Sequence, residues 1–310
     1  MALDYHALHF AERLDLGRAP SDRLHLVHAS GRGAQLELPA GWLSLWLPLR
    51  GALQVQSLLS HWSLPKAQLL VGRDGPLRGG TRTPAWWLAL AGPMAAWNTL
   101  LQALPERPLA SDVFPRQWTC PRELRRLLVR LARLARRPER DAERGPVVAA
   151  LGAALLERQN ELQPLLERSN GRTAQRRRQT LLRLLRVHQL IERDSEGRLD
   201  LAQLAQIASY SPWHLIRMYR EVFGETPSEH AARLRLDRAW SLVCDSAMPV
   251  CEITEALGFE SQSAFCRAFK NAYGLTTTQV RHLPPVLMRQ AGAWASHART
   301  RVRRAQTRTA

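Results

Sequence analysis

The sequence predicts an α+β multidomain protein with an N-terminal β-barrel or sandwich, a helical linker and an all-α C-terminal domain. Three observations support this fold class. Short apolar runs broken by glycine and proline fill the first third of the chain, apolar residues at helical spacing follow, and one helix-turn-helix pattern occurs twice near the end. At 310 residues the chain is long enough for two domains with separate cores.

Residues 1–115 are expected to form short strands. Six of the ten tryptophans lie here, among the runs LSLWLPL, ALQVQSLL, AQLLVG and WWLALAG, each of strand length and bounded by turn residues such as Gly51 and Gly72. Several short strands at close spacing are typical of a small barrel or sandwich. Four tryptophans are candidates either for an aromatic pocket that binds a small effector or for the core: Trp42, Trp46, Trp86 and Trp87.

Residues 116–195 are expected to form a helical linker. Its first helix carries an apolar stripe and should end at Pro138 and the polar stretch ERDAERGP, and a second helix should run from about Val147 to Glu161. The first stripe consists of Leu124, Leu127, Leu128, Leu131 and Leu134. The third helix has a stripe of Leu181, Leu184, Leu185, His188 and Ile191. Such stripes need a partner, which is either the flanking domains or a second copy of the chain in a homodimer.

Composition limits the class of partner and the compartment. The chain has 44 Lys+Arg against 27 Asp+Glu, a formal charge of +17. This excess favours binding to a polyanion such as nucleic acid. The alternative is a protein from a GC-rich genome, in which arginine codons are common. The first residues lack the pattern of a signal peptide, and no window has the ~18 consecutive apolar residues of a membrane span. We expect a cytoplasmic protein with no membrane association, and a disordered basic tail at 289–310.

Neither catalytic residues, a metal site nor a cofactor is expected. The four cysteines, Cys120, Cys244, Cys251 and Cys266, show no CxxC spacing. The histidines of the first third (His6, His9, His25, His28 and His61) lack the HxH…E cluster that a metal-dependent barrel enzyme needs. His25 and His28, three residues apart, should point to opposite faces of a strand.

The first copy of the repeated pattern lies within LAQIASYSPWHLIRMYREVFGETPSE, from Leu204 to Glu229. Ser209 and Tyr210 should make the turn, and Ser211 is a good N-cap for the helix that follows. That helix should bury Leu215, Met218 and Tyr219, with Phe223 below them. The residues left facing outward are Trp213, His214, Ile216, Arg217 and Arg220.

The second copy, ITEALGFESQSAFCRAFKNAYGLTTTQ, runs from Ile253 to Gln279. Ser211 matches Ser261 and Arg217 matches Arg267, each pair 50 positions apart. The second helix should bury Phe265, Ala268 and Phe269. Its outward residues are Gln262, Ser263, Cys266, Arg267 and Lys270.

The segment between the copies should be one long helix. Thr226-Pro227-Ser228-Glu229 is a capping box with proline at the first helical position, and the helix should run to about Cys244. About 18 residues at 1.5 Å span ~27 Å, close to one ~34 Å turn of DNA once loops are added. A single chain could thus place two helices in successive major-groove segments.

Residues 196–288 resemble the AraC/XylS family of bacterial transcription regulators. The resemblance rests on SPWHLIRMYREVFGETP and, above all, on GFESQSAFCRAFKNAYGLT. It implies base-contacting positions at Trp213, Ile216 and Arg217 in one helix. In the other helix it implies Gln262, Ser263, Cys266 and Arg267. The family pattern is broken at Ser209, His230, Thr277 and Val280, which affects capping and packing rather than base readout.

The resemblance also implies an effector-binding, cupin-like β-barrel in the N-terminal region and dimerising helices beyond it. The expected function is therefore sequence-specific binding of double-stranded promoter or operator DNA, with transcription regulated in response to a small effector. RNA polymerase is a further candidate partner. The alternative is a DNA-modifying or repair protein that uses the repeat for targeting, for which Cys120 is the candidate nucleophile outside the repeat.

Overall fold

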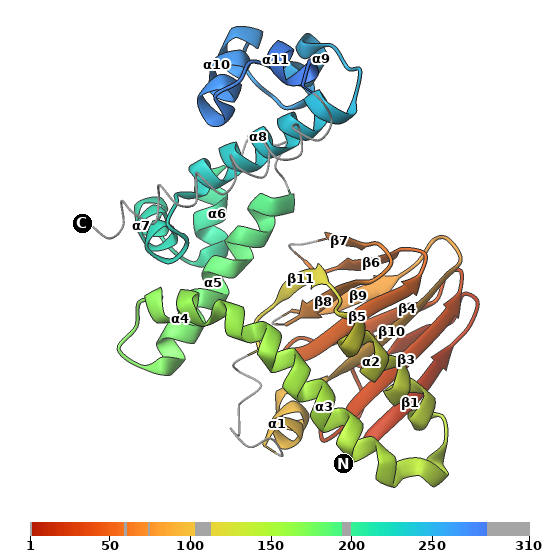
Figure 1. Cartoon of the computed structure of the whole chain (residues 1–310). Coiled ribbons are helices and arrows are strands. Elements are labelled where there is room, and N and C mark those ends of the chain that lie inside the picture. Colours follow the sequence, from red (N-terminus) through yellow and green to blue (C-terminus); the bar gives the residue numbers. More distant parts are fainter. Residues whose placement is uncertain (1, 59–60, 74, 103–112, 194–199, 284–310) are drawn as a thin grey trace. The chain divides into compact units, whose positions relative to one another are not determined.

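The computed structural model describes residues 2–58, 61–73, 75–102, 113–193 and 200–283 (Figure 1). The chain divides into two compact units, Met1–Pro164 and Leu165–Ala310. The residues of the predicted linker, 116–195, are shared between these units, and its dimerising role stays a prediction. The predicted basic tail at 289–310 lies outside the described residues.

The first unit contains two β-sheets (Figure 1). The six-stranded sheet has the order β1 (Leu3–Leu8), β3 (Leu24–Gly31), β10 (Ala85–Pro93), β5 (Trp42–Arg50), β8 (Gln68–Gly72) and β11 (Arg116–Thr119). The five-stranded sheet has the order β2 (Arg13–Asp15), β4 (Gln35–Leu38), β9 (Leu77–Gly80), β6 (Leu53–Gln56) and β7 (His61–Leu64). Pairing is antiparallel except between β1 and β3 and between β2 and β4. Among the described residues the strands form two packed sheets and no closed barrel.

The strand-rich character predicted for this region is confirmed. The four apolar runs correspond to β5, β6, β8 and β10. The short strands β2, β4, β7 and β9 were not predicted, because they have three or four residues and carry polar side chains. β2, β4 and β9 pair with strands distant in the sequence, which a local pattern does not reveal, whereas β7 pairs with β6, the strand directly before it.

The core between the sheets is built around tryptophan. Trp46 and Trp87 are fully buried, with ring centroids 6.0 Å apart, and the Trp46 indole nitrogen donates to Ser44 Oγ at 2.9 Å. Trp42 is also buried, whereas Trp86 is 46% exposed. Trp42, Trp46 and Trp87 thus contribute to the packed core between the sheets.

Two helices, α1 (Met94–Leu101) and α2 (Arg122–Ala135), pack on the outer face of the six-stranded sheet, and α3 (Asp141–Gln159) packs on both of them. The stripe predicted for α2 is largely buried; Leu127 alone of its five leucines is only partly buried. Two boundaries were wrong. Arg116–Thr119 is a strand paired with β8 rather than the start of a helix. The stretch ERDAERGP was expected to separate two helices, but most of it forms the start of α3. The carboxylates of Asp141 and Glu143 in the first turn stabilise this helix by interacting with the positive end of its dipole.

The second unit is helical (Figure 1). The short 3-10 helices η2 (Pro138–Arg140) and η3 (Asn160–Leu162) belong to the first unit, and α4 (Gln163–Arg168) spans the division between the units. The further helices of the second unit are α5 (Ala174–Arg193), α6 (Leu201–Ala208), α7 (Pro212–Phe223), α8 (Pro227–Asp245), α9 (Val250–Ala256), α10 (Gln262–Tyr273) and α11 (Thr277–Arg281). The two predicted helix-turn-helix motifs are α6–α7 and α9–α10, and the predicted long helix is α8. None of the helices in the described ranges is long and apolar enough to cross a bilayer.

Candidate nucleic-acid interface

The first recognition helix, α7, is delimited by its own sequence. Ser211 caps it by accepting a hydrogen bond from the His214 amide at 3.3 Å, and Pro212 occupies its first turn. Gly224 ends it with φ 79°, a left-handed conformation that favours glycine. These signals fix which residues of α7 face the core and which face outward.

The inner face of α7 contains the predicted Leu215, Met218 and Tyr219. They are buried together with Val222, which was not predicted, whereas Phe223 is half-buried. The outer face begins with Trp213, whose side chain is 69% exposed, and the Arg217 guanidinium lies over its ring at 5.3 Å from the centroid. This cation–π contact restricts the direction of the exposed Arg217 side chain.

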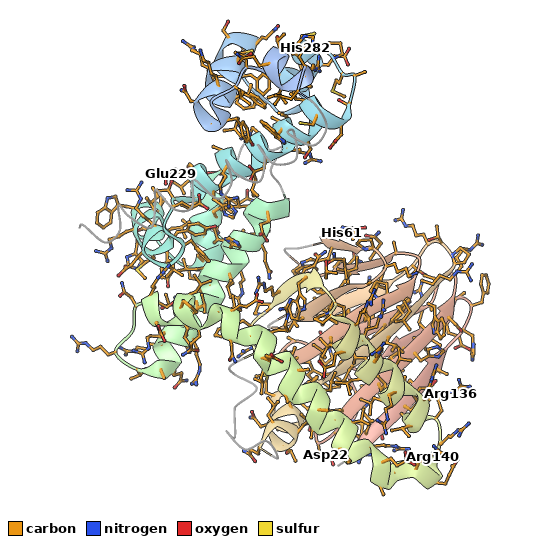
Figure 2. The ribbon with its side chains drawn as sticks, in the orientation of Figure 1. Asp22, His61, Arg136, Arg140, Glu229 and His282 are labelled. Atoms are coloured by element: carbon orange, nitrogen blue, oxygen red, sulfur yellow. The ribbon has the colours of Figure 1, made fainter. Side chains whose placement is uncertain are left out.

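Two residues expected on the outer face of α7 are partly covered. The His214 ring packs edge-on against Tyr210, with centroids 4.8 Å apart, and Ile216 is half-buried. Arg220 is exposed, but its guanidinium lies 3.5 Å from the Glu229 carboxylate. Glu229 lies near the start of α8, where Figure 2 labels it. Trp213 and Arg217 therefore form the most accessible part of this face.

The second recognition helix, α10, has the same construction. Ser261 accepts from the Ala264 amide at 3.2 Å, and Gly274 ends the helix with φ 72°. Phe265 and Phe269 are fully buried, and Phe269 stacks on Trp240 of α8 with centroids 5.8 Å apart. Ala268, which was also expected to face inward, is half-buried.

The outer face of α10 differs from that of α7. Four of its predicted residues are exposed: Gln262, Ser263, Arg267 and Lys270. The fifth, Cys266, is only partly buried and packs against the cluster that contains Phe265 and Phe269. The face thus presents an amide, a hydroxyl and two cations, without a counterpart of the exposed indole on α7.

The turns that precede the two recognition helices use different residues for one conformation. Gly258 has φ 65°, whereas Ser209 has φ 55° and ψ 47°. Both residues are in the left-handed region, a backbone conformation that is strained for any residue with a Cβ. The amide of Ser209 donates to the Gln206 carbonyl at 2.9 Å, so the turn is held in spite of that strain.

Helix α8 joins the two motifs. Its capping box is formed as predicted: the Glu229 amide donates to Thr226 Oγ1 and the Glu229 carboxylate accepts from the Thr226 amide. The helix has 19 residues, so at 1.5 Å per residue it spans about 28 Å. Tyr273 at the end of α10 donates to Asp237 of α8 at 3.2 Å, which ties the second motif to this helix.

A polar cluster that the sequence did not predict lies behind α7. The Tyr219 hydroxyl is 2.8 Å from His188 Nδ1 and 2.6 Å from His230 Nδ1. Burial, followed by the proximity of His188, lowers the pKa of His230 to about 4, so this ring is neutral at pH 7. His188 belongs to the predicted stripe of α5, but the contact joins residues far apart in the chain and no local spacing signals it.

The comparisons with known proteins agree with this architecture. Residues 204–282 match a family model described as a helix-turn-helix domain. The probable transcriptional regulator LumQ of Photobacterium leiognathi is 28% identical over 120 residues, which are 39% of this chain and 48% of LumQ. The transcriptional regulator Rob of Salmonella typhimurium is 32% identical over 105 residues, 33% of this chain and 34% of Rob. The chain thus spans about half of the first relative and about a third of the second.

Solved structures with likeness to the chain cover about a third of it. The C-terminal domain of the response regulator AraT from Geobacillus stearothermophilus is 30% identical, with a TM-score of 0.30 over 32% of this chain and 83% of that one. An AraC-type regulator from Chromobacterium violaceum is 26% identical, with a TM-score of 0.31 over 33% of this chain and 91% of that one. Residues 204–282, which the family model matches, form an AraC-type helix-turn-helix domain, the DNA-binding domain of the AraC/XylS family.

Proposed function

We propose that the protein is a sequence-specific transcription regulator that places α7 and α10 in successive major-groove segments of promoter or operator DNA. The observation that carries the proposal is the pair of equally capped helices that expose matched arginines, Arg217 and Arg267, on either side of α8. A span of about 28 Å for α8, plus its flanking loops, is close to the ~34 Å turn of B-DNA.

The exposed side chains divide into base readers and phosphate binders. A guanidinium can bond the O6 and N7 atoms of guanine together, and the amide of Gln262 can bond adenine in the same bidentate way. The Trp213 ring contacts the Arg217 guanidinium and presents an apolar surface to sugars or thymine methyl groups. Lys270, and Arg220 beside Glu229, suit phosphate contacts.

Two substitutions test the readout. We expect Arg217→Ala and Arg267→Ala each to weaken binding to the cognate site by ~1–3 kcal/mol and to change binding to random DNA little. Affinities would be measured by fluorescence anisotropy on both DNAs at one fixed salt concentration. Equal losses on the two DNAs would assign these arginines to phosphate and contradict the proposal.

Lys270→Ala is the matched control from the same helix. A phosphate contact carries no sequence information, so this change should weaken binding to both DNAs alike and lower the slope of log K against log [salt] by about 1. A loss confined to the cognate site would move Lys270 into the base-reading group.

The first unit is the proposed cupin-like sensor. What supports an effector site there is a shallow, solvent-open pocket of about 650 Å³ beside β1. Its lining includes Asp4 paired with Arg23 at 3.2 Å and Asp141 paired with Arg144 at 2.9 Å. Charges of both signs favour a small polar, charged effector over an apolar one. Melting shifts across a metabolite panel test this, and Arg23→Ala should abolish any shift that the pocket produces.

The alternative, a DNA-modifying or repair protein, depends on a reactive group outside the repeat. Burial raises the pKa of the Cys120 thiol to about 11, which opposes a role as nucleophile. We expect iodoacetamide to alkylate the exposed Cys251 at neutral pH while Cys120 stays unmodified, as measured by peptide mass spectrometry. Comparable rates at Cys120, or a covalent or cleaved DNA product, would favour the alternative.

The proposal also includes an oligomeric state, a protein partner and a cellular compartment. Homodimerisation through the helices of 116–195, contact with RNA polymerase and a cytoplasmic location follow from the regulator role. Sedimentation of the full chain with and without operator DNA tests the dimer.

A further inference from the structure

Three ring side chains from three helices meet on the buried side of α7. Tyr219 of α7 places its hydroxyl between Nδ1 of His188 on α5 and Nδ1 of His230 on α8, at 2.8 and 2.6 Å. The centroids of the two imidazole rings lie 4.4 Å apart, and their planes are inclined by 31°. Since both Nδ1 atoms contact one hydroxyl, the Nε2 atoms are left for other partners.

The contacts around Tyr219 favour one placement of the protons. The Glu192 carboxylate, which only accepts, lies 3.4 Å from His188 Nε2, so a proton on this nitrogen faces an acceptor. With that proton in place, His188 Nδ1 accepts from the Tyr219 hydroxyl, and the Tyr219 oxygen accepts from His230 Nδ1–H. His230 Nε2 then has a bare lone pair. It is buried in a residue that is 1% exposed and has no hydrogen-bond partner among the described residues.

A buried nitrogen lone pair without a partner is costly unless something binds it. The donor atoms offered by His188, Glu192 and His230 all lie within 4.8 Å of one another, and in the described part of the chain this is the one such group of three. His188 and Glu192 are four residues apart on α5, the spacing that presents two ligands on one face of a helix.

We propose that His188 Nε2, His230 Nε2 and the Glu192 carboxylate bind a divalent transition-metal ion of the Zn²⁺ class. Imidazole nitrogens with one carboxylate oxygen are a donor set that Zn²⁺ takes readily, and the ion keeps a fourth position for water. The Glu192 side chain is 52% exposed and gives the ion a path from solvent. The ion replaces the Nε2 proton of His188, so binding releases a proton.

A residue that would orient both metal-binding histidines is already present. Metal-bound histidines are usually held by a hydrogen bond to the ring nitrogen that does not bind the metal. Here the Tyr219 hydroxyl contacts that nitrogen, Nδ1, in both His188 and His230. Bound metal would cross-link α5 to α8 behind the recognition helix that carries Trp213 and Arg217. The consequence is a first motif whose stability, and the position of α7, depend on metal availability.

The test uses the full chain after dialysis against a chelator, titrated with ZnSO4 in a calorimeter. We expect one ion per chain and an increase in melting temperature. Glu192→Gln alters an exposed ligand without disturbing the core and should weaken binding at least tenfold, as should His188→Gln. Tyr219→Phe keeps the ring but removes the hydroxyl that contacts both histidines, for an expected loss of about 10–100-fold.

The matched control is His6→Gln, which disrupts a histidine pair of the first unit, where His6 Nε2 lies 3.2 Å from His25 Nδ1. It should leave the stoichiometry and affinity unchanged. X-ray absorption of the Zn²⁺-loaded chain should show nitrogen and oxygen ligands only, at about 2.0–2.2 Å. Absence of binding, affinity unaffected by Glu192→Gln and His188→Gln, or a sulfur ligand would each overturn the proposal.

Discussion

Ser209 shows how a single backbone angle limits the stability of the first motif. It has φ 55°, where the second motif has Gly258 with φ 65°. A residue with a Cβ in this conformation destabilises the folded state by roughly 1–2 kcal/mol. Replacement by glycine removes that strain, but glycine also has more conformational freedom in the unfolded chain, which offsets part of the gain. We expect Ser209→Gly to raise the free energy of unfolding by about 0.5–1 kcal/mol, as measured by urea denaturation followed by circular dichroism.

The reciprocal change is the control for this expectation. Gly258→Ala introduces a Cβ into the same conformation and should lower the free energy of unfolding by about 1 kcal/mol. Destabilisation by Ser209→Gly would mean that the serine side chain, rather than the strain, dominates at this turn.

His25 links the stability of the first unit to pH. Its side chain is 1% exposed, stacks on Trp42 and lies 3.2 Å from His6. Burial is the main cause that lowers the pKa of His25, and it also lowers the pKa of His6. Between the two pKa values the unfolded chain therefore binds protons that the folded chain does not bind. The contribution of these histidines to the free energy of unfolding is complete above the ordinary histidine pKa of about 6.5 and is lost as pH falls below it.

Denaturant titrations between pH 8 and pH 5, followed by tryptophan fluorescence, measure this effect. We expect the free energy of unfolding of the first unit to decrease toward pH 5, and His25→Gln to reduce that slope. A stability that rises on acidification would contradict the assignment of His25 as a buried neutral ring.

At the scale of elements, the packing of the two sheets depends on a glycine beneath Trp46. A Cβ added at Gly79 would lie 2.1 Å from Trp46 Cζ3 and 2.7 Å from its Cη2, in a fully buried core. We expect Gly79→Ala to cost about 1–3 kcal/mol of stability because the indole has to move. Gly75→Ala is the control, since nothing lies within 4 Å of the added atom. Equal effects on the melting temperature would exclude overpacking as the cause.

The elements also show which features a sequence can predict. Helices α7, α8 and α10 were predicted because their caps, Ser211, Thr226 and Ser261, and their apolar periods are encoded within a few residues. Strands β2, β4 and β9 were not predicted, since pairing between distant segments defines them, and β7 was not predicted because its four residues are too few for a clear pattern. The start of α3 was misplaced because its charged first turn reads locally as a loop.

The candidate site divides in the same way. The exposure of Trp213, Arg217, Gln262 and Arg267 follows from helical periodicity and was expected. The ion pair of Arg220, the partial burial of Cys266 and the His188–Tyr219–His230 contact depend on tertiary packing and were not. Whether these outward residues read bases stays a prediction.

At the scale of the whole molecule, the two motifs are alike in construction and different in the surface that they present. One face offers Trp213 with Arg217, and the other offers Gln262, Ser263 and Arg267. A single chain with two unequal reading helices should bind a non-palindromic site. Its two halves should be centred about 10 base pairs apart on one face of the DNA.

A binding assay over every single-base variant of the cognate site tests this account most directly. Wild-type protein should show two short clusters of sensitive base pairs, one helical turn apart. Arg217→Ala should relax specificity in one cluster only, and Arg267→Ala in the other only, with about 1–3 kcal/mol lost at the affected base pairs. Relaxation of both clusters by either substitution, or a single palindromic cluster, would contradict the account of α7 and α10 as two separate readers.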